Sequence, residues 1–122
     1  MSKSYNLGRK GERLAEKYLT DKKFNILKKN WHYHHKEVDI IAEKNGVLIF
    51  VEVKTRSTNY FGEPFESVTQ KKQEFLIEAA NGYLEDNGLD KEVRFDVISI
   101  VISGTNPPEI FHIPDAFSPE VQ

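Results

Sequence analysis

The fold of this chain is decided by residues 36–54, which read KEVDIIAEKNGVLIFVEVK. Two runs rich in β-branched residues flank Asn45-Gly46, and Asn-Gly in that position is the strongest short-range signal for a β-hairpin. If Asn45-Gly46 is a two-residue turn, Lys44 faces Val47 and Asp39 lies directly opposite Glu52. Side chains alternate along a strand, so Glu37 would lie opposite Lys54 on the same face. The stretch therefore predicts a hairpin with one charged end.

The two faces of the hairpin support this register over the alternative, a three-residue loop with a bulge that would shift the pairing by one residue. One face would be an unbroken aliphatic surface that suits burial. Its members are Val38, Ile40, Ala42, Val47, Ile49, Val51 and Val53. The other face would carry Ile41, Leu48 and Phe50 near the turn and the charged side chains away from it. A charged cluster on an apolar hairpin costs stability and indicates a role beyond folding.

The charged end of the hairpin has the composition of a site for a divalent cation. Two carboxylates directly opposite each other repel, and a cation offsets that repulsion most directly. Asp39 and Glu52 would supply two ligands and the backbone carbonyl of Val53 a third, because Mg²⁺ and Mn²⁺ favour oxygen. Lys54 would stand beside an attacking water, as phosphodiester hydrolysis requires. The alternative is a cross-strand salt bridge between Glu37 and Lys54, worth ~0–1 kcal/mol.

Length and composition limit the other possibilities. The 122 residues, 39% of them hydrophobic, suit one domain with one core, residues 1–122. The chain has no cysteine, which excludes disulfides and thiolate metal sites. It has no apolar run of the ~18–20 residues that a membrane span needs and no secretory apolar segment at its start. We expect a cytoplasmic location and no membrane contact.

The charge is unevenly distributed along the chain. Residues 1–36 carry ten Lys or Arg against three acidic residues, a net charge of +7, which leaves −9 for the rest of a chain whose net charge is −2. This asymmetry predicts a surface that faces a polyanion, although lysines that only solvate an exposed helix and strand would give the same pattern. The nucleic-acid-binding candidates are Arg9, Lys10, Arg13, Lys28 and Lys29, joined from later segments by Arg56 and Lys72.

Hydrophobic spacing and turn residues predict the order α-β-β-β-α-β-β, a mixed sheet with helices packed against it. Residues 55–93 are long enough for a parallel crossover. We expect Ser67 to cap the second helix, with Gln70 at N3 as a capping box. The elements are a helix over about 6–20, a strand from 24 towards 31, the hairpin of 36–55, a loop over 56–66, a helix ending near 87–88, a strand over 93–103 buried on both faces, a short edge strand over 109–113 and a tail over 114–122.

Asp39 followed by Glu52-Val53-Lys54 resembles the signature of the PD-(D/E)XK nucleases, although Val38 stands where that signature has proline. More narrowly, three blocks resemble the YraN-like family of small bacterial proteins, regarded as predicted endonucleases distantly similar to archaeal Holliday junction resolvases. They are GRKGERLAEKYL (8–19), EVDIIA (37–42) and FVEVKTR (50–56). The resemblance covers about residues 7–113. It implies a restriction-endonuclease-like αβββαβ core, and Glu12 as a further acid and metal ligand beside Asp39, Glu52 and Lys54.

Together these features predict a Mg²⁺- or Mn²⁺-dependent DNA endonuclease, acting on branched or junction DNA as a homodimer. Tyr60, Phe61, Pro64 and Phe65 would form the dimer contact, and Tyr60 and Phe61 would otherwise stack on bases. One alternative is a nucleic-acid- or protein-binding module of the same fold without turnover. Another is a metal-independent glycosidase, which Lys54 and the basic first third of the chain argue against. His32 and His34 alternate onto one strand face and form a weaker transition-metal candidate.

Overall fold

The computed structural model describes residues 3–57, 68–104 and 106–119, and within them the predicted order of elements is confirmed. The elements are α1 (Lys3–Asp21), β1 (Asn25–Tyr33), β2 (Lys36–Lys44), β3 (Val47–Ser57), α2 (Gln70–Asp86), β4 (Val93–Ile102) and β5 (Glu109–Phe117). The strands form one sheet in the order β1-β2-β3-β4-β5. β3 and β4 are parallel and the other neighbours antiparallel, so the sheet is mixed, as predicted.

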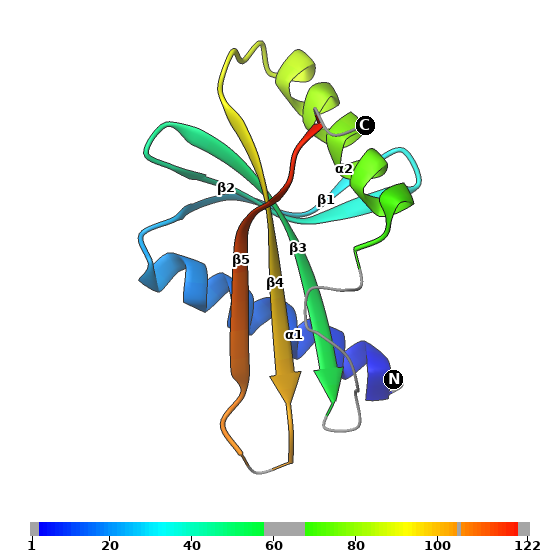
Figure 1. The fold of residues 1–122 in the computed structure, drawn as a ribbon, viewed down its shortest axis with the longest axis vertical. Helices are drawn as coiled ribbons and strands as arrows, with labels where there is room; N and C mark the ends of the chain where they lie inside the picture. Colours follow the sequence, from blue (N-terminus) through cyan, green and yellow to red (C-terminus); the bar gives the residue numbers. More distant parts are fainter. Residues whose placement is uncertain (1–2, 58–67, 105, 120–122) are drawn as a thin grey trace.

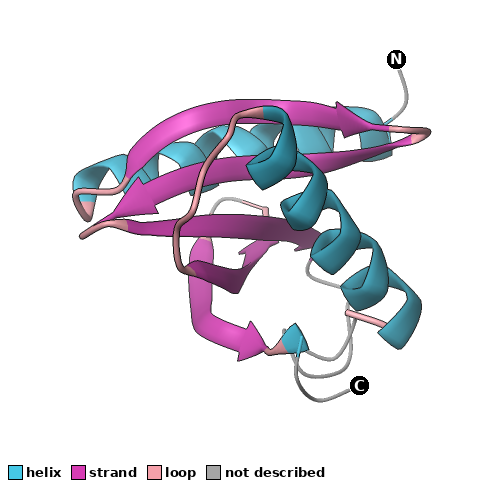
Figure 2. Cartoon of the chain, turned by 90° about the horizontal axis from the view of Figure 1, so that it is seen from above, coloured by secondary structure: helices cyan, strands magenta, loops and turns pink. Residues whose placement is uncertain are grey.

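The two helices cover opposite faces of the sheet. In Figure 1 the blue helix α1 runs behind β3, β4 and β5, and Figure 2 shows α2 on the other side of the strands. Ala15 and Leu19 of α1 pack on Ile40, Ala42, Ile49, Val51, Ile98 and Ile100. Leu76, Ala79, Ala80 and Tyr83 of α2 pack on Val38, Ile41, Leu48, Phe50 and Phe95. Because both faces are covered, the central strands are apolar on both sides, as expected for β4.

The Asn45-Gly46 turn has the predicted form. Both residues have positive φ, 53° and 81°, as a two-residue turn of type I′ requires. Lys44 pairs with Val47, and the predicted register continues to Ile40 opposite Val51. The pairing of β2 with β3 stops there, while β3 remains paired with β4 along its whole length and β2 remains paired with β1. The predicted ladder pairs Asp39–Glu52 and Glu37–Lys54 are therefore wrong.

The divergence of the two strands also changes one predicted face. Val38 was expected beside Ile40 on the aliphatic face, but it packs in the α2-side cluster. Beyond Ile40, β2 keeps its ladder pairing with β1, where Trp31 pairs with Val38 and packs against the same cluster. A strand that loses one neighbour can twist more, so the assignment of side chains to faces in the part of β2 that pairs with β3 does not continue to Val38.

Several element ends differ from the sequence-based prediction. Thr69, not Ser67, is the N-cap of α2: its hydroxyl accepts a hydrogen bond from the Lys72 amide at 3.1 Å. β3 runs to Ser57 and takes in Arg56, and β5 runs to Phe117, so residues 114–117 are strand and not tail. The proposed dimer loop, with Tyr60, Phe61, Pro64 and Phe65, lies outside the described residues. Neither of the two described helices has the length and apolarity to cross a bilayer.

Candidate functional site

The candidate site lies where β2 and β3 separate. The Asp39 carboxylate reaches across the fork and accepts a hydrogen bond from the backbone N–H of Val53 at 2.8 Å. Glu52, on β3, is only 4% exposed. Its Oε1 has no hydrogen-bond partner within the described part of the chain. A buried carboxylate oxygen without a donor is costly, and such an atom calls for a functional explanation.

Two lysines approach Glu52 from different elements. Lys54 Nζ, from the same strand, lies 3.5 Å from Glu52 Oε2. Lys72 Nζ, from the first turn of α2, lies 3.6 Å from Glu52 Oε1. The sequence suggested Lys72 only as a contact to a nucleic-acid backbone. Its position beside Glu52 depends on the long crossover between β3 and α2, which no local sequence signal reveals.

The acidic groups of the site perturb one another. Burial, together with the negative charges of Glu52 and Glu12, raises the pKa of Asp39 from 3.8 to about 7, against the lowering effects of the Val53 N–H and Lys72. A carboxyl group in this condition resists ionisation unless positive charge is brought close to it. A positive charge placed close to both carboxyl groups would lower this pKa.

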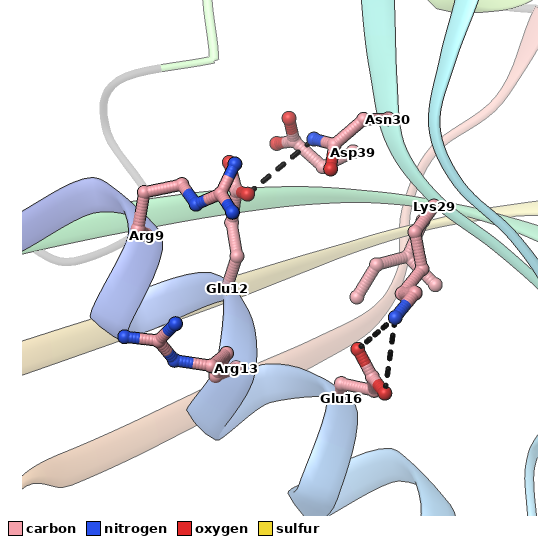
Figure 3. Close-up of a pocket in the computed structure, with 8 residues that line it drawn as sticks. Arg9, Glu12, Arg13, Glu16, Lys29, Asn30 and Asp39 are labelled. Carbon is pink, nitrogen blue, oxygen red and sulfur yellow. Dashed lines mark hydrogen bonds and ion pairs between the residues drawn. The ribbon is translucent and has the colours of Figure 1, made fainter. Parts of the chain in front are cut away.

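Glu12 reaches this region because α1 packs unusually close to β3. A Cβ placed on Gly11 would lie 1.9 Å from Thr55 Oγ1, so only glycine permits this approach. Figure 3 shows Arg9 and Glu12 projecting from α1 towards Asn30 and Asp39. Glu12 accepts a hydrogen bond from Asn30 at 3.3 Å. Gly11 thus allows α1 to approach β3 closely, and this approach brings Glu12, the next residue, to the site.

A cavity of about 170 Å³ opens beside Asp39, between α1 and the strands β1 and β2. Its basic lining comes from the predicted nucleic-acid-binding set, and Lys29 is also paired with Glu16 at 3.2 Å. The lining residues are Arg9, Glu12, Arg13, Glu16, Lys29, Asn30, Asp39 and Ile40. Lys10 and Lys28 are exposed outside this lining, and Arg56 is half-buried on β3.

The residues present suit a hard divalent cation in part. Asp39 and Glu52 offer oxygen atoms, one of them without a hydrogen-bond partner. In the described residues no three His, Cys, Asp or Glu side chains are grouped as a ready-made metal site. Glu12 is turned towards Asn30, so a third ligand from this acid, or from the Val53 carbonyl, stays a prediction. His32 is paired with Glu37 at 3.0 Å, and His34 packs edge-on against Tyr33.

A second charged cluster, on β4 and β5, was not predicted. Asp96, fully buried, accepts hydrogen bonds from Arg94 and His112, each at 2.8 Å, and from the Asp115 N–H at 3.0 Å. The Tyr18 hydroxyl and His112 Nδ1 are hydrogen-bonded at 3.1 Å, which ties α1 to β5. Burial alone would raise the pKa of Asp96, but these hydrogen bonds lower it. With all its partners in place, the cluster is structural.

The fold and the site define a class: an α/β protein with a mixed five-stranded sheet and a carboxylate–lysine cluster at a fork between two strands. Within that class the chain belongs to the uncharacterised protein family UPF0102, whose sequence model matches residues 11–100. The family expected from the motifs is thereby confirmed. A UPF0102 protein of Christiangramia forsetii is 47% identical over 96% of this chain and 98% of its own. Those of Phocaeicola vulgatus and Chlorobium phaeobacteroides are each 42% identical, over 99% and 98% of both chains.

Proposed function

We propose that this protein is a metal-dependent DNA endonuclease of the PD-(D/E)XK superfamily that uses Mg²⁺ or Mn²⁺. The observation that carries the proposal is the buried Glu52, with one unpartnered oxygen, next to Asp39 with its raised pKa. Two acids forced together in a partly buried place are unfavourable for folding and useful for holding a cation. The lysines beside them suit a reaction in which negative charge builds up on phosphate.

Each residue has a separate part in the proposed hydrolysis. A water oxygen attacks phosphorus, one P–O ester bond breaks, the water gives up a proton and the leaving oxygen gains one. Asp39 and Glu52 would hold the cation, with Glu12 as a further ligand, and a bound Mg²⁺ or Mn²⁺ would supply positive charge to neutralise the phosphate. Lys54 orients the water and stabilises the charge that develops in the transition state. The Val53 N–H fixes the Asp39 carboxylate in place.

The basic residues of α1 and β1 would hold the DNA backbone next to these acids. Arg9 and Arg13 are exposed on α1, and Lys29 lines the same cavity as Asp39. Phosphate contacts position a duplex without reading its sequence, so this surface supports binding to a backbone of any sequence. Branched DNA as substrate and a homodimer as the active form are part of this proposal, since two symmetric strands are matched most simply by a two-fold dimer.

The test is cleavage of labelled linear, nicked, flapped and four-way-junction DNAs by the purified protein with Mn²⁺ or Mg²⁺. We expect cleavage by the parent and loss of cleavage in Asp39→Asn and Glu52→Gln. Glu37→Gln is the matched control, because Glu37 lies on the same hairpin, is exposed and pairs with His32. A Glu52→Gln variant that cleaves at the parent rate would contradict the proposal.

The Lys54→Ala variant distinguishes the hypothesis of an enzyme from that of a binding module. If Lys54 acts on the reacting centre, its removal lowers the single-turnover rate far more than the DNA affinity. Equal losses in both would make Lys54 an ordinary phosphate contact. If the parent protein binds DNA but cuts none of these substrates with either cation, it is a binding module. The ion pairs of Glu52 with Lys54 and Lys72 support this alternative.

A further inference from the structure

The two lysines beside Glu52 differ in how firmly the fold holds them there. Lys54 lies on the same strand as Glu52, two residues away, so their side chains share a face and are held together by the strand. Lys72 belongs to α2, and its ammonium reaches Glu52 only through its long flexible side chain. The side chain is 30% exposed, so its outer end has access to solvent. Lys72 can therefore leave Glu52 without any change in the backbone.

The contact between Lys72 and Glu52 is also loose. The distance from Nζ to Oε1 is 3.6 Å, and Oε1 remains without a hydrogen bond within the described residues. The same ammonium lies 5.8 Å from the centre of the Phe75 ring, one turn along α2. An ammonium that neutralises a carboxylate through space, without donating to it, is easily replaced by a stronger positive charge.

Without a cation, Lys54 and Lys72 already place two positive charges beside Glu52. Asp39, Glu52 and Glu12 bring up to three negative charges when ionised. A divalent cation placed between the acids would add two further positive charges next to both ammonium groups. Like charges at such short range disfavour each other, so one ammonium has to withdraw. Lys72 is the one that is free to do so.

We propose that Lys72 is a positioning residue that exchanges partners: its ammonium neutralises Glu52 when no divalent cation is bound and moves to a DNA phosphate when one is. The inference rests on the proposed function, because it takes Glu52 as a cation ligand and DNA as the substrate. It assigns Lys72 a competing role towards the cation that a plain phosphate contact would not have. It also couples the two ligands, since a phosphate that attracts Lys72 frees Glu52, and such coupling is reciprocal.

The test is the affinity for Mn²⁺ without DNA, measured by calorimetry on the parent, Lys72→Met, Lys72→Arg and Lys71→Met. Methionine keeps the length of the side chain and removes its charge, and we expect it to tighten Mn²⁺ binding by about tenfold, within the range of ordinary coupling between sites. Lys72→Arg keeps the charge and should bind Mn²⁺ like the parent. Lys71 is the exposed neighbour on the same turn, and Lys71→Met should have no effect.

A second measurement tests the coupling itself. DNA affinity of the parent, measured by fluorescence anisotropy in EDTA and in Ca²⁺, should rise with the cation, and in Lys72→Met the rise should be several-fold smaller. Equal Mn²⁺ affinities of parent and Lys72→Met overturn the inference. If the parent binds Mn²⁺ and Glu52→Gln does not, the proposed cation site survives that result. If the parent binds no Mn²⁺ at all, both proposals fall.

Discussion

Replacing Asp39 by asparagine should stabilise the metal-free protein at alkaline pH. In the folded chain, burial and the nearby charges of Glu52 and Glu12 raise the pKa of Asp39 from 3.8 to about 7. Between these two values the folded state holds a proton that the unfolded state has released. Raising the pH through this window therefore favours unfolding, and the loss is complete above about pH 7.

The size of the effect follows from the two pKa values. At about 1.4 kcal/mol for each tenfold change in the ionisation constant, a rise from 3.8 to about 7 corresponds to an upper limit of about 4 kcal/mol of folding free energy. Asparagine has nearly the same shape, keeps an oxygen for the Val53 N–H and does not ionise. We expect Asp39→Asn to be about 2–4 kcal/mol more stable than the parent at pH 8.5, and the difference to fall to about 1 kcal/mol or less at pH 4.5.

The assay is urea unfolding in EDTA at several pH values from 4.5 to 8.5. Asp90→Asn serves as the matched control, because Asp90 is an exposed aspartate between α2 and β4, and its curve should follow that of the parent. Adding Mn²⁺ at pH 8.5 should then stabilise the parent and leave Asp39→Asn nearly unchanged. If the parent and Asp39→Asn show parallel stability curves over the whole range, the repulsion inferred between the acids does not exist.

Three further changes test other parts of the structure. Gly11→Ala should cost about 1–3 kcal/mol of stability in thermal unfolding, since the added Cβ meets Thr55 at 1.9 Å, whereas Gly8→Ala, with nothing within 4 Å, should be neutral or slightly stabilising. Asp96→Ala should cost about 3–5 kcal/mol in urea unfolding at pH 7, because Arg94 would lose its buried partner. The pKa of Asp96 is lowered in the folded state, so its contribution to stability is present above pH 3.8 and is lost as the pH falls below that value. Reversing Lys28 and Lys29 to Glu should flatten the slope of log K against log salt for DNA binding by about one unit for each lost phosphate contact, and an unchanged slope would show that these lysines only solvate the surface.

The sequence predicted those features that neighbouring residues determine. Asn45 and Gly46 both tolerate positive φ, so the turn and the register from Lys44–Val47 to Ile40–Val51 could be read directly. The order of elements followed from periodicity and turn residues in the same way. The end of the hairpin ladder could not be read, because β3 stays with β4, a strand more than 40 residues further along the chain.

The misplaced residues have the same kind of cause. The N-cap of α2 was placed at Ser67 because the capping-box pattern fits there, but Thr69, two residues later, is also a good cap and is the one that α2 uses. Lys72 could be assigned to Glu52 only once the crossover had brought α2 next to β3. Asp96 was not singled out in the sequence, because its partners Arg94 and His112 come together only when β5 pairs with β4.

The fork between β2 and β3 gives the molecule a built-in reporter. Val53 lies beyond the end of the β2–β3 ladder, and its amide hydrogen is held by the Asp39 carboxylate. Protection of that single amide from exchange with solvent, and its chemical shift, therefore depend on where the Asp39 oxygens point and how much negative charge they carry. One backbone resonance would follow protonation of the acid, arrival of a cation and approach of a substrate, with no label added to the protein.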